Sequence, residues 1–141
     1  MTTVEITDRV GPPLPGEPLI RRAIDAAAAR CGVPERLSVV FVDAAEMTAL
    51  NRRHTGRDEA TDVLAFPLDA ETAQDGPLGE VIVCAELARE RAGEGAIREA
   101  LLYVVHGVLH LSGYDDGGGD AASMYEMEDA IVASVCEEED S

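Results

Sequence analysis

The stretch that decides the fold is LLYVVHGVLHLSGYDD, residues 101–116. It is almost wholly apolar up to Leu111, which predicts a buried helix that Ser112 and Gly113 bring to an end. His106 and His110 stand four residues apart in it, so a helix places both imidazoles on one face, one turn apart. Two ionisable rings in an apolar helix need a partner, and a metal ion is one that fits.

The composition predicts a globular protein with a strongly acidic surface. Hydrophobic residues make up 46% and charged residues 28% of the chain, and its 141 residues fit a single domain, 1–141, with a sizeable core. The net charge of −17 argues against a general nucleic-acid coat protein, because such a surface repels phosphate. All 11 basic residues are arginines, so any basic surface has to be a local patch.

The cysteines and the start of the chain predict a cytoplasmic location. Cys31, Cys84 and Cys136 are odd in number and widely spaced, so we expect reduced packing residues rather than disulfides or metal ligands. The first residues, MTTVEITD, have neither the basic nor the apolar segment of a secretion signal. No later apolar run is long enough to cross a membrane, so no membrane association is expected.

Hydrophobic periodicity predicts an α+β domain, in which a mixed four-stranded sheet packs with about five helices. Alternating or β-branched segments predict strands at 2–7, 37–42, 61–67 and 79–84. Apolar residues at helical spacing predict helices at 17–30, 44–53, 86–92, 96–111 and 120–135. The first strand is expected at an edge, and the third and fourth should pair antiparallel. Asp43 should cap the second helix, and the acidic tail 137–141 should fray.

A carboxylate after the histidine helix would complete a metal site with three protein ligands. Two imidazole nitrogens and one carboxylate oxygen leave a fourth position open, which is typical of catalytic rather than structural zinc. Water bound there has a pKa of about 7 and supplies hydroxide at neutral pH. Aspartates in such places also simply form turns and cap helices. Spacing alone does not choose the third ligand, for which the candidates are Asp115, Asp116, Asp120 and His54.

Gly107 argues against one class of metal enzyme, the zinc peptidases. It follows the first histidine at the position where zinc peptidases of the HExxH type carry their general base. Without that glutamate, a peptidase of this type is not expected. We interpret the glycine as opening backbone space beside the metal.

The only basic cluster in this acidic chain is RRHTGR, residues 52–57. The forked donors of Arg52, Arg53 and Arg57 suit backbone phosphates. The alternative interpretation is the solvated end of a helix, since runs of charge usually lie on the surface.

Motifs through most of the chain match those of one known family in order. HGVLHLSGYD at 106–115 resembles the signature HGxLHLxGYDH. LN at 50–51, GRD at 56–58 and TDVLAFP at 61–67 resemble the block LN…GKD…TDVLSFP, and further matches are GEVIV at 79–83 and Met124 with Glu128. Together these motifs resemble the YbeY family of bacterial metal-dependent endoribonucleases, which act in ribosomal RNA maturation and ribosome quality control.

The resemblance implies a zinc site and an RNA substrate. It implies one Zn²⁺ per chain bound by His106, His110 and Asp116, with Mn or Fe as alternatives because a carboxylate is a harder ligand. The implied partners are ribosomal RNA and the small ribosomal subunit or its proteins. We expect Arg52, Arg53 and Arg57 to bind the RNA, with Arg57 also a candidate catalytic residue. Asp115 and Glu128 are candidate general bases on proximity alone.

Three positions depart from the family pattern. Asp116 stands where the family has a third histidine, and its charge makes a bound metal a weaker Lewis acid. Thr55 replaces an arginine that the resemblance implies is important for activity, and Ala65 replaces a serine. These departures bear on catalytic strength.

The sequence therefore predicts a single-strand-specific, metal-dependent endoribonuclease of ribosomal RNA. One alternative is a non-catalytic ribosome-assembly factor whose metal is structural. Two others are a metal hydrolase of another substrate and a chain whose histidines bind no metal.

Overall fold

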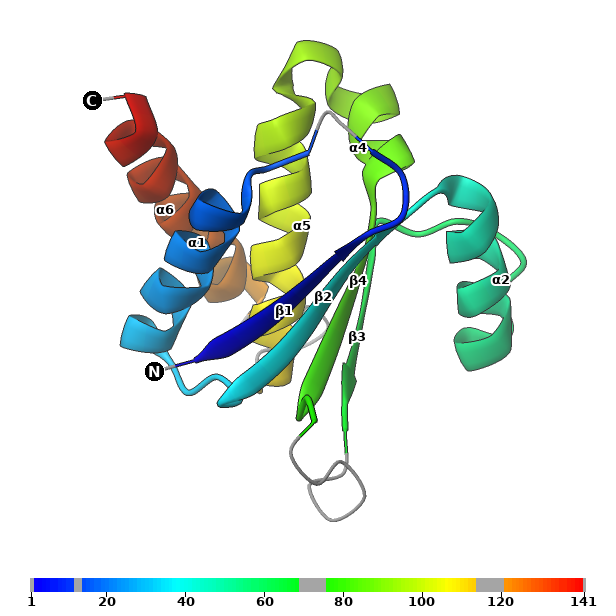
Figure 1. Cartoon of the computed structure of the whole chain (residues 1–141), viewed down its shortest axis with the longest axis horizontal. Helices are drawn as coiled ribbons and strands as arrows, with labels where there is room; N and C mark the ends of the chain where they lie inside the picture. Colours follow the sequence, from blue (N-terminus) through cyan, green and yellow to red (C-terminus); the bar gives the residue numbers. More distant parts are fainter. Residues whose placement is uncertain (1, 12–13, 69–75, 114–120, 141) are drawn as a thin grey trace.

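The computed structural model of the chain describes residues 2–11, 14–68, 76–113 and 121–140, which form the predicted α+β fold (Figure 1). The strands are β1 (Thr3–Asp8), β2 (Arg36–Val42), β3 (Val63–Pro67) and β4 (Gly79–Cys84). The helices are α1 (Glu17–Arg30), α2 (Ala44–Thr55), α4 (Ala85–Ala92), α5 (Ala96–Leu111) and α6 (Ala121–Asp140), with a short 3₁₀ helix at Gly93–Gly95. Each predicted strand and helix is present, so the differences are confined to element ends.

The sheet is mixed, as predicted, and its strand order is β1-β2-β4-β3. β1 pairs with β2 and β2 with β4 in parallel, whereas β3 and β4 pair antiparallel with Leu64 opposite Ile82. The predicted edge position of β1 and the predicted antiparallel pair are confirmed. β3 forms the other edge of the sheet, which places it beside the functional residues described below.

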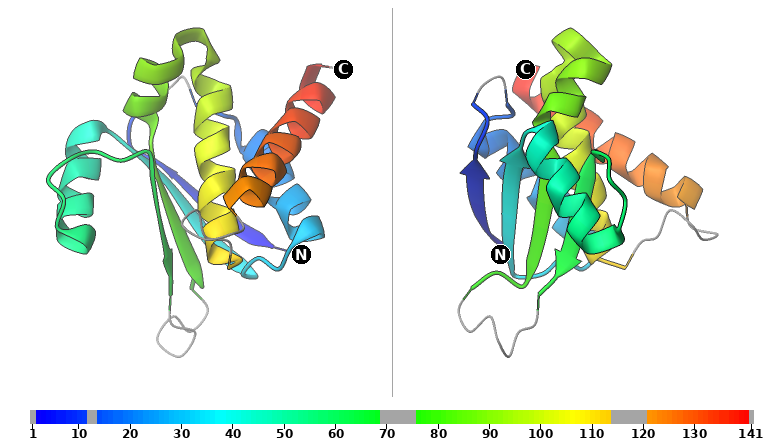
Figure 2. Two further views of the ribbon diagram at one scale, coloured as in Figure 1. Left: turned by 180° about the vertical axis from the view of Figure 1, so that it is seen from behind. Right: turned by 90° about the vertical axis from the view of Figure 1, so that its right-hand side faces the viewer.

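Helices cover the two faces of the sheet unequally. α1, α5 and α6 lie on one face and α2 lies on the other (Figures 1 and 2). Alternate residues of β2 therefore enter different cores: Val39 and Phe41 join the core with α5, and Val40 and Val42 pack with Met47 of α2. This burial on both faces explains why β2 reads as a continuous apolar run rather than an alternating one.

α5 is the central helix, and its bounds are those predicted. It lies against β3, β4, α1 and α6, and its side chains from Leu101 to Leu109 are largely buried. Ser112 follows its last turn, and Gly113 then takes a φ of 101°, a left-handed conformation that favours glycine.

Gly107 lets α5 approach the sheet closely. A methyl group placed on its Cα would lie 2.7 Å from Cγ1 of Val81 and 3.1 Å from Cγ2 of Val63. The interpretation that this glycine opens space beside a metal is therefore wrong. Its missing side chain faces β3 and β4, because the helix is packed too tightly there for even one carbon.

Gly107→Ala is expected to destabilise the protein by about 1–3 kcal/mol through overpacking, although alanine favours a helix by about 1 kcal/mol. The free energy of unfolding in urea measures this loss. The double variant with Val81→Ala makes room for the new methyl group, so its loss should be smaller than the sum of the two single losses. A more stable Gly107→Ala variant would contradict the close packing.

The ends of two helices differ from the prediction. Asp43 caps α2 as expected, accepting a hydrogen bond from the backbone N–H of Glu46 at 2.8 Å, but the Glu46 carboxylate pairs with Arg9. α2 continues to Thr55 and ends at Gly56, whose φ is 83°. α6 continues to Asp140, beyond its predicted end at Val135; no glycine or proline interrupts this stretch, and glutamate favours helix. The fraying of the tail stays a prediction.

Two further predictions from the sequence concern the state of the cysteines and helices that could cross a membrane. Cys31, Cys84 and Cys136 are all free thiols, and burial raises the pKa of Cys84, which keeps it protonated. Within the described ranges, no helix combines the length and the apolar character needed to cross a membrane.

Candidate metal centre

His106 and His110 face one another on the partly exposed side of α5. Their Nε2 atoms are 3.2 Å apart, and their rings meet edge to face with centroids 4.8 Å apart. The His106 side chain retains 16% of its accessible surface, so the pair lies at the surface of the core rather than inside it. Helical spacing thus brings the two imidazoles together as the sequence predicts.

Glu128 of α6 fixes the orientation of His106. Its carboxylate Oε2 lies 2.7 Å from Nδ1 of His106, and its side chain is only 5% exposed. A buried carboxylate at this distance accepts the Nδ1–H hydrogen bond and favours the tautomer whose Nε2 carries a lone pair. That nitrogen is the one directed at His110.

The geometry of the histidine pair fits a bound metal ion. Two nitrogens on one tetrahedral zinc ion are about 3.4 Å apart, since each zinc–nitrogen bond is about 2.0–2.1 Å. The Nε2–Nε2 separation of 3.2 Å is close to this value, and it also fits an N–H···N hydrogen bond. The carboxylate–histidine contact is the support that metal-binding histidines usually have.

Most candidates for the third ligand lie outside the described residues: Asp115, Asp116 and Asp120. Among the residues that are described, no three His, Cys, Asp or Glu side chains come together closely enough to hold an ion. This excludes the grouping of His54 with the two histidines of α5. His54 instead packs against Phe66, with ring centroids 4.4 Å apart.

Three cavities connect the histidine pair with the basic cluster. The histidine cavity, of about 280 Å³, is lined by His106, Glu128 and Tyr125, and the arginine cavity, of about 610 Å³, is lined by Arg57 and Thr55. Asp62 and Arg91 line both of these cavities. A groove of about 390 Å³ along β3 joins Thr55 to His110. The candidate site is therefore a continuous surface across the β3 edge of the sheet.

The predicted RNA-binding arginines lie at the exposed end of α2. Arg52, Arg53 and Arg57 are all exposed, but only Arg57 lines one of the three cavities. Thr55, the residue that departs from the family pattern, has its hydroxyl 2.7 Å from Oδ1 and 2.9 Å from the carbonyl oxygen of the buried Asn51. Its side chain therefore serves the local structure of the helix end.

A hydrogen-bond network that the sequence did not predict lies between these cavities. Nη1 of Arg91 lies 3.3 Å from Oδ2 of Asp62 and 3.2 Å from Oη of Tyr103, which donates to Glu99 at 2.9 Å. Burial raises the pKa of Tyr103 to about 12, so its phenol stays protonated at neutral pH and is not a general base. Glu99 and Tyr103 are four residues apart on α5, but no spacing rule connects them with Asp62 and Arg91, which come from other parts of the chain.

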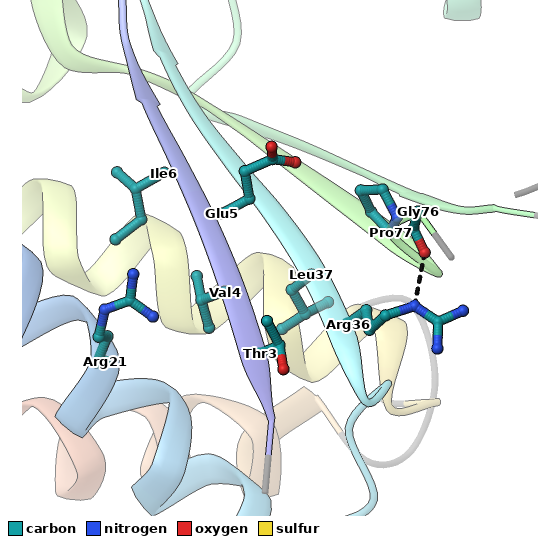
Figure 3. Close-up of a pocket in the computed structure, with 9 residues that line it drawn as sticks. All are labelled: Thr3, Val4, Glu5, Ile6, Arg21, Arg36, Leu37, Gly76 and Pro77. Carbon is teal, nitrogen blue, oxygen red and sulfur yellow. Dashed lines mark hydrogen bonds between the residues drawn. The ribbon is translucent and has the colours of Figure 1, made fainter. Parts of the chain in front are cut away.

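A separate cavity of about 560 Å³ lies at the opposite edge of the sheet, beside β1 (Figure 3). Figure 3 shows Arg36 at the start of β2, whose Nε donates to the carbonyl oxygen of Gly76 at 2.7 Å. The residues that line this cavity include no histidine or cysteine within the described part of the chain.

Comparison with known protein families agrees with the motifs at this site. The family model described as endoribonuclease YbeY matches residues 15–136, which include the histidine pair, Glu128 and the basic cluster. This chain belongs to the YbeY family. The resemblance seen in the sequence is thereby confirmed.

Proteins named endoribonuclease YbeY are similar over most of the chain. The one from Alkalilimnicola ehrlichii is 40% identical, covering 86% of this chain and 79% of the relative. The one from Chromobacterium violaceum is 39% identical, covering 86% and 76%, and that from Micrococcus luteus is 35% identical, covering 94% and 91%.

A solved structure also resembles this YbeY fold. The solution structure of TM1509 from Thermotoga maritima aligns with a TM-score of 0.63 and 28% sequence identity. The alignment covers 96% of this chain and 91% of that protein, so it includes both the sheet and the helices around the candidate site.

Proposed function

We propose that this chain is a metal-dependent endoribonuclease that cuts single-stranded RNA in the maturation and quality control of ribosomes. The observation that carries the proposal is the pair of facing Nε2 atoms of His106 and His110, 3.2 Å apart, in a chain of the YbeY family. Its partners in this proposal are ribosomal RNA and the small ribosomal subunit or its proteins, in the cytoplasm.

The proposed cofactor is one Zn²⁺ per chain, held by His106, His110 and Asp116. A harder carboxylate ligand also makes Mn or Fe acceptable. When bound, the ion supplies Lewis-acid polarisation of a phosphoryl oxygen. The described residues support this assignment because Glu128 holds His106 in the tautomer that a metal needs.

The other side chains of the site bind and orient the RNA. Arg57, at the arginine cavity, is placed to bind a backbone phosphate with its forked donors. Arg52 and Arg53 add charge at the same helix end, and Asp115 remains a candidate general base. This local charge gives an acidic protein a defined place for a polyanion.

Tyr125 supports the preference for single strands. Its side chain is 49% exposed at the histidine cavity, and its ring stacks on that of His106 with centroids 6.1 Å apart. An exposed aromatic ring beside a reacting phosphate offers a stacking surface to an unpaired base, which a base inside a duplex cannot use.

The test is cleavage of a single-stranded RNA and of a duplex that contains the same strand. We expect untagged protein to cut the single strand and to leave the duplex intact. Chelation should stop the reaction, and added Zn²⁺ should restore it. Cleavage that survives chelation, or no cleavage with metal present, counts against the proposal.

A non-catalytic ribosome-assembly factor is the second candidate. Thr55 favours it, because its hydroxyl is hydrogen-bonded to Asn51 where the family pattern has an arginine. The variant carrying Thr55→Arg and Asp116→His separates the two functions in the same assay. Cleavage that appears only in this variant would assign the natural chain to the non-catalytic role.

A further inference from the structure

We infer that Arg91 of α4 is a phosphate-binding residue, which holds a backbone phosphate of the RNA strand next to the histidine pair. The inference rests on the proposed function and adds a residue to it. Arg91 lines the histidine cavity together with His106 and the arginine cavity together with Arg57, so it stands where a strand crossing from one to the other must pass.

The position of Arg91 is fixed relative to the histidines through α5. Its Nη1 lies 3.2 Å from the hydroxyl of Tyr103, and its guanidinium carbon is 6.0 Å from the centre of that ring. Tyr103 precedes His106 by three residues on the same helix, so the two side chains are neighbours on one face. Arg91 is therefore held beside the metal-binding edge of α5.

The guanidinium keeps donors available for a ligand. Only Nη1 is bonded among the described residues, to Asp62 and Tyr103, which leaves Nη2 and Nε without a protein partner there. The side chain is 50% exposed, so these donors reach solvent. Two N–H groups in a fixed plane match two oxygens of a phosphate.

The charges at the histidine cavity are mixed, and Arg91 supplies the positive charge there among the described residues. In the part of the chain that the structure describes, three carboxylates line the histidine cavity, and each has a partner: Asp62 pairs with Arg91, Glu99 accepts from Tyr103, and Glu128 contacts His106. Arg91 is the only arginine among the described residues that line this cavity. A phosphate bound there would exchange its hydrating water for hydrogen bonds from a guanidinium that is already held in place.

The experiment measures binding of a short labelled single-stranded RNA to the full chain without metal, across a salt series. Arg91→Gln is expected to weaken binding about tenfold and to lower the slope of log affinity against log salt by about 0.7. Arg91→Lys should keep the slope and lose less affinity. Arg98→Gln removes an exposed arginine of α5 that lines none of the three cavities, so it should match the wild type.

Asp62→Asn separates phosphate binding from a structural role. It removes the same ion pair as Arg91→Gln but leaves the guanidinium in place, so RNA binding should be as tight as in the wild type or tighter. If both variants weaken binding equally, Arg91 acts only through its ion pair and the inference is overturned.

Cleavage kinetics keep the inference distinct from the proposed function. With metal bound, Arg91→Gln should raise KM about tenfold and leave kcat within about threefold. Wild-type cleavage that Arg91→Gln leaves unchanged would overturn the inference while the endoribonuclease proposal stands. Arg91-dependent binding without any cleavage would support the phosphate site and count against the endoribonuclease.

Discussion

His110→Ala is expected to abolish the proposed metal binding and to reduce RNA cleavage to background. His110 supplies one of the two nitrogens that face each other at 3.2 Å, and His106 alone cannot chelate an ion from this helix. Loss of a direct ligand should cost more than the roughly 10–100-fold that loss of a ligand's supporting contact costs in metal affinity. Metal analysis of untagged protein measures the effect, from about one equivalent in the wild type to none.

His54→Ala is the matched control for this prediction. His54 is the remaining histidine of the chain and packs on Phe66 at the end of α2, so its removal should leave the metal content unchanged. Unfolding measurements on both variants separate metal loss from misfolding, because His110 is only partly buried. A metal-free wild type, or a His110→Ala variant that keeps its ion, would contradict the metal centre.

The fold could be predicted from the sequence because the hydrophobic pattern of each main element agrees with the burial of its side chains. β2 and α5 are strongly apolar, and Asp43 after β2 and Gly113 after α5 mark where they end, so both elements could be predicted. The ends of α2 and α6 were less predictable. Asp140 stays helical because nothing in the sequence breaks the helix, and a polar helix end carries no burial signal.

The candidate site was predictable only where its residues share one helix. His106 and His110 are paired by a helical repeat, which the sequence displays directly. The partner of His106 is Glu128, which lies 22 residues away on another helix, and its carboxylate looked equally suited to be a general base. The place of Arg91 in the site could not be predicted from the sequence, because its position beside Tyr103 depends on how α4 packs at the end of the sheet.

Glu128→Ala is expected to weaken metal binding roughly 10–100-fold, the usual cost of removing the carboxylate behind a metal-binding histidine. The carboxylate is buried and lies 2.7 Å from Nδ1 of His106, so its loss frees the ring to rotate and to protonate the wrong nitrogen. Glu128→Gln should lose less, because its amide oxygen still accepts the Nδ1–H hydrogen bond. Competition with a chelator of known affinity measures both variants.

Comparison of metal affinity with cleavage decides between the two roles of Glu128. Asp129→Ala removes the adjacent, exposed carboxylate of α6 and should leave metal affinity unchanged, which controls for the loss of one negative charge. If Glu128 only positions His106, Glu128→Ala loses more metal affinity than Glu128→Gln does. Saturating metal then restores most of the cleavage activity of both variants. If instead Glu128→Gln binds metal as tightly as the wild type and still fails to cut RNA, Glu128 acts in the chemical step rather than in metal binding, as expected of a general base, because an amide cannot take up the proton.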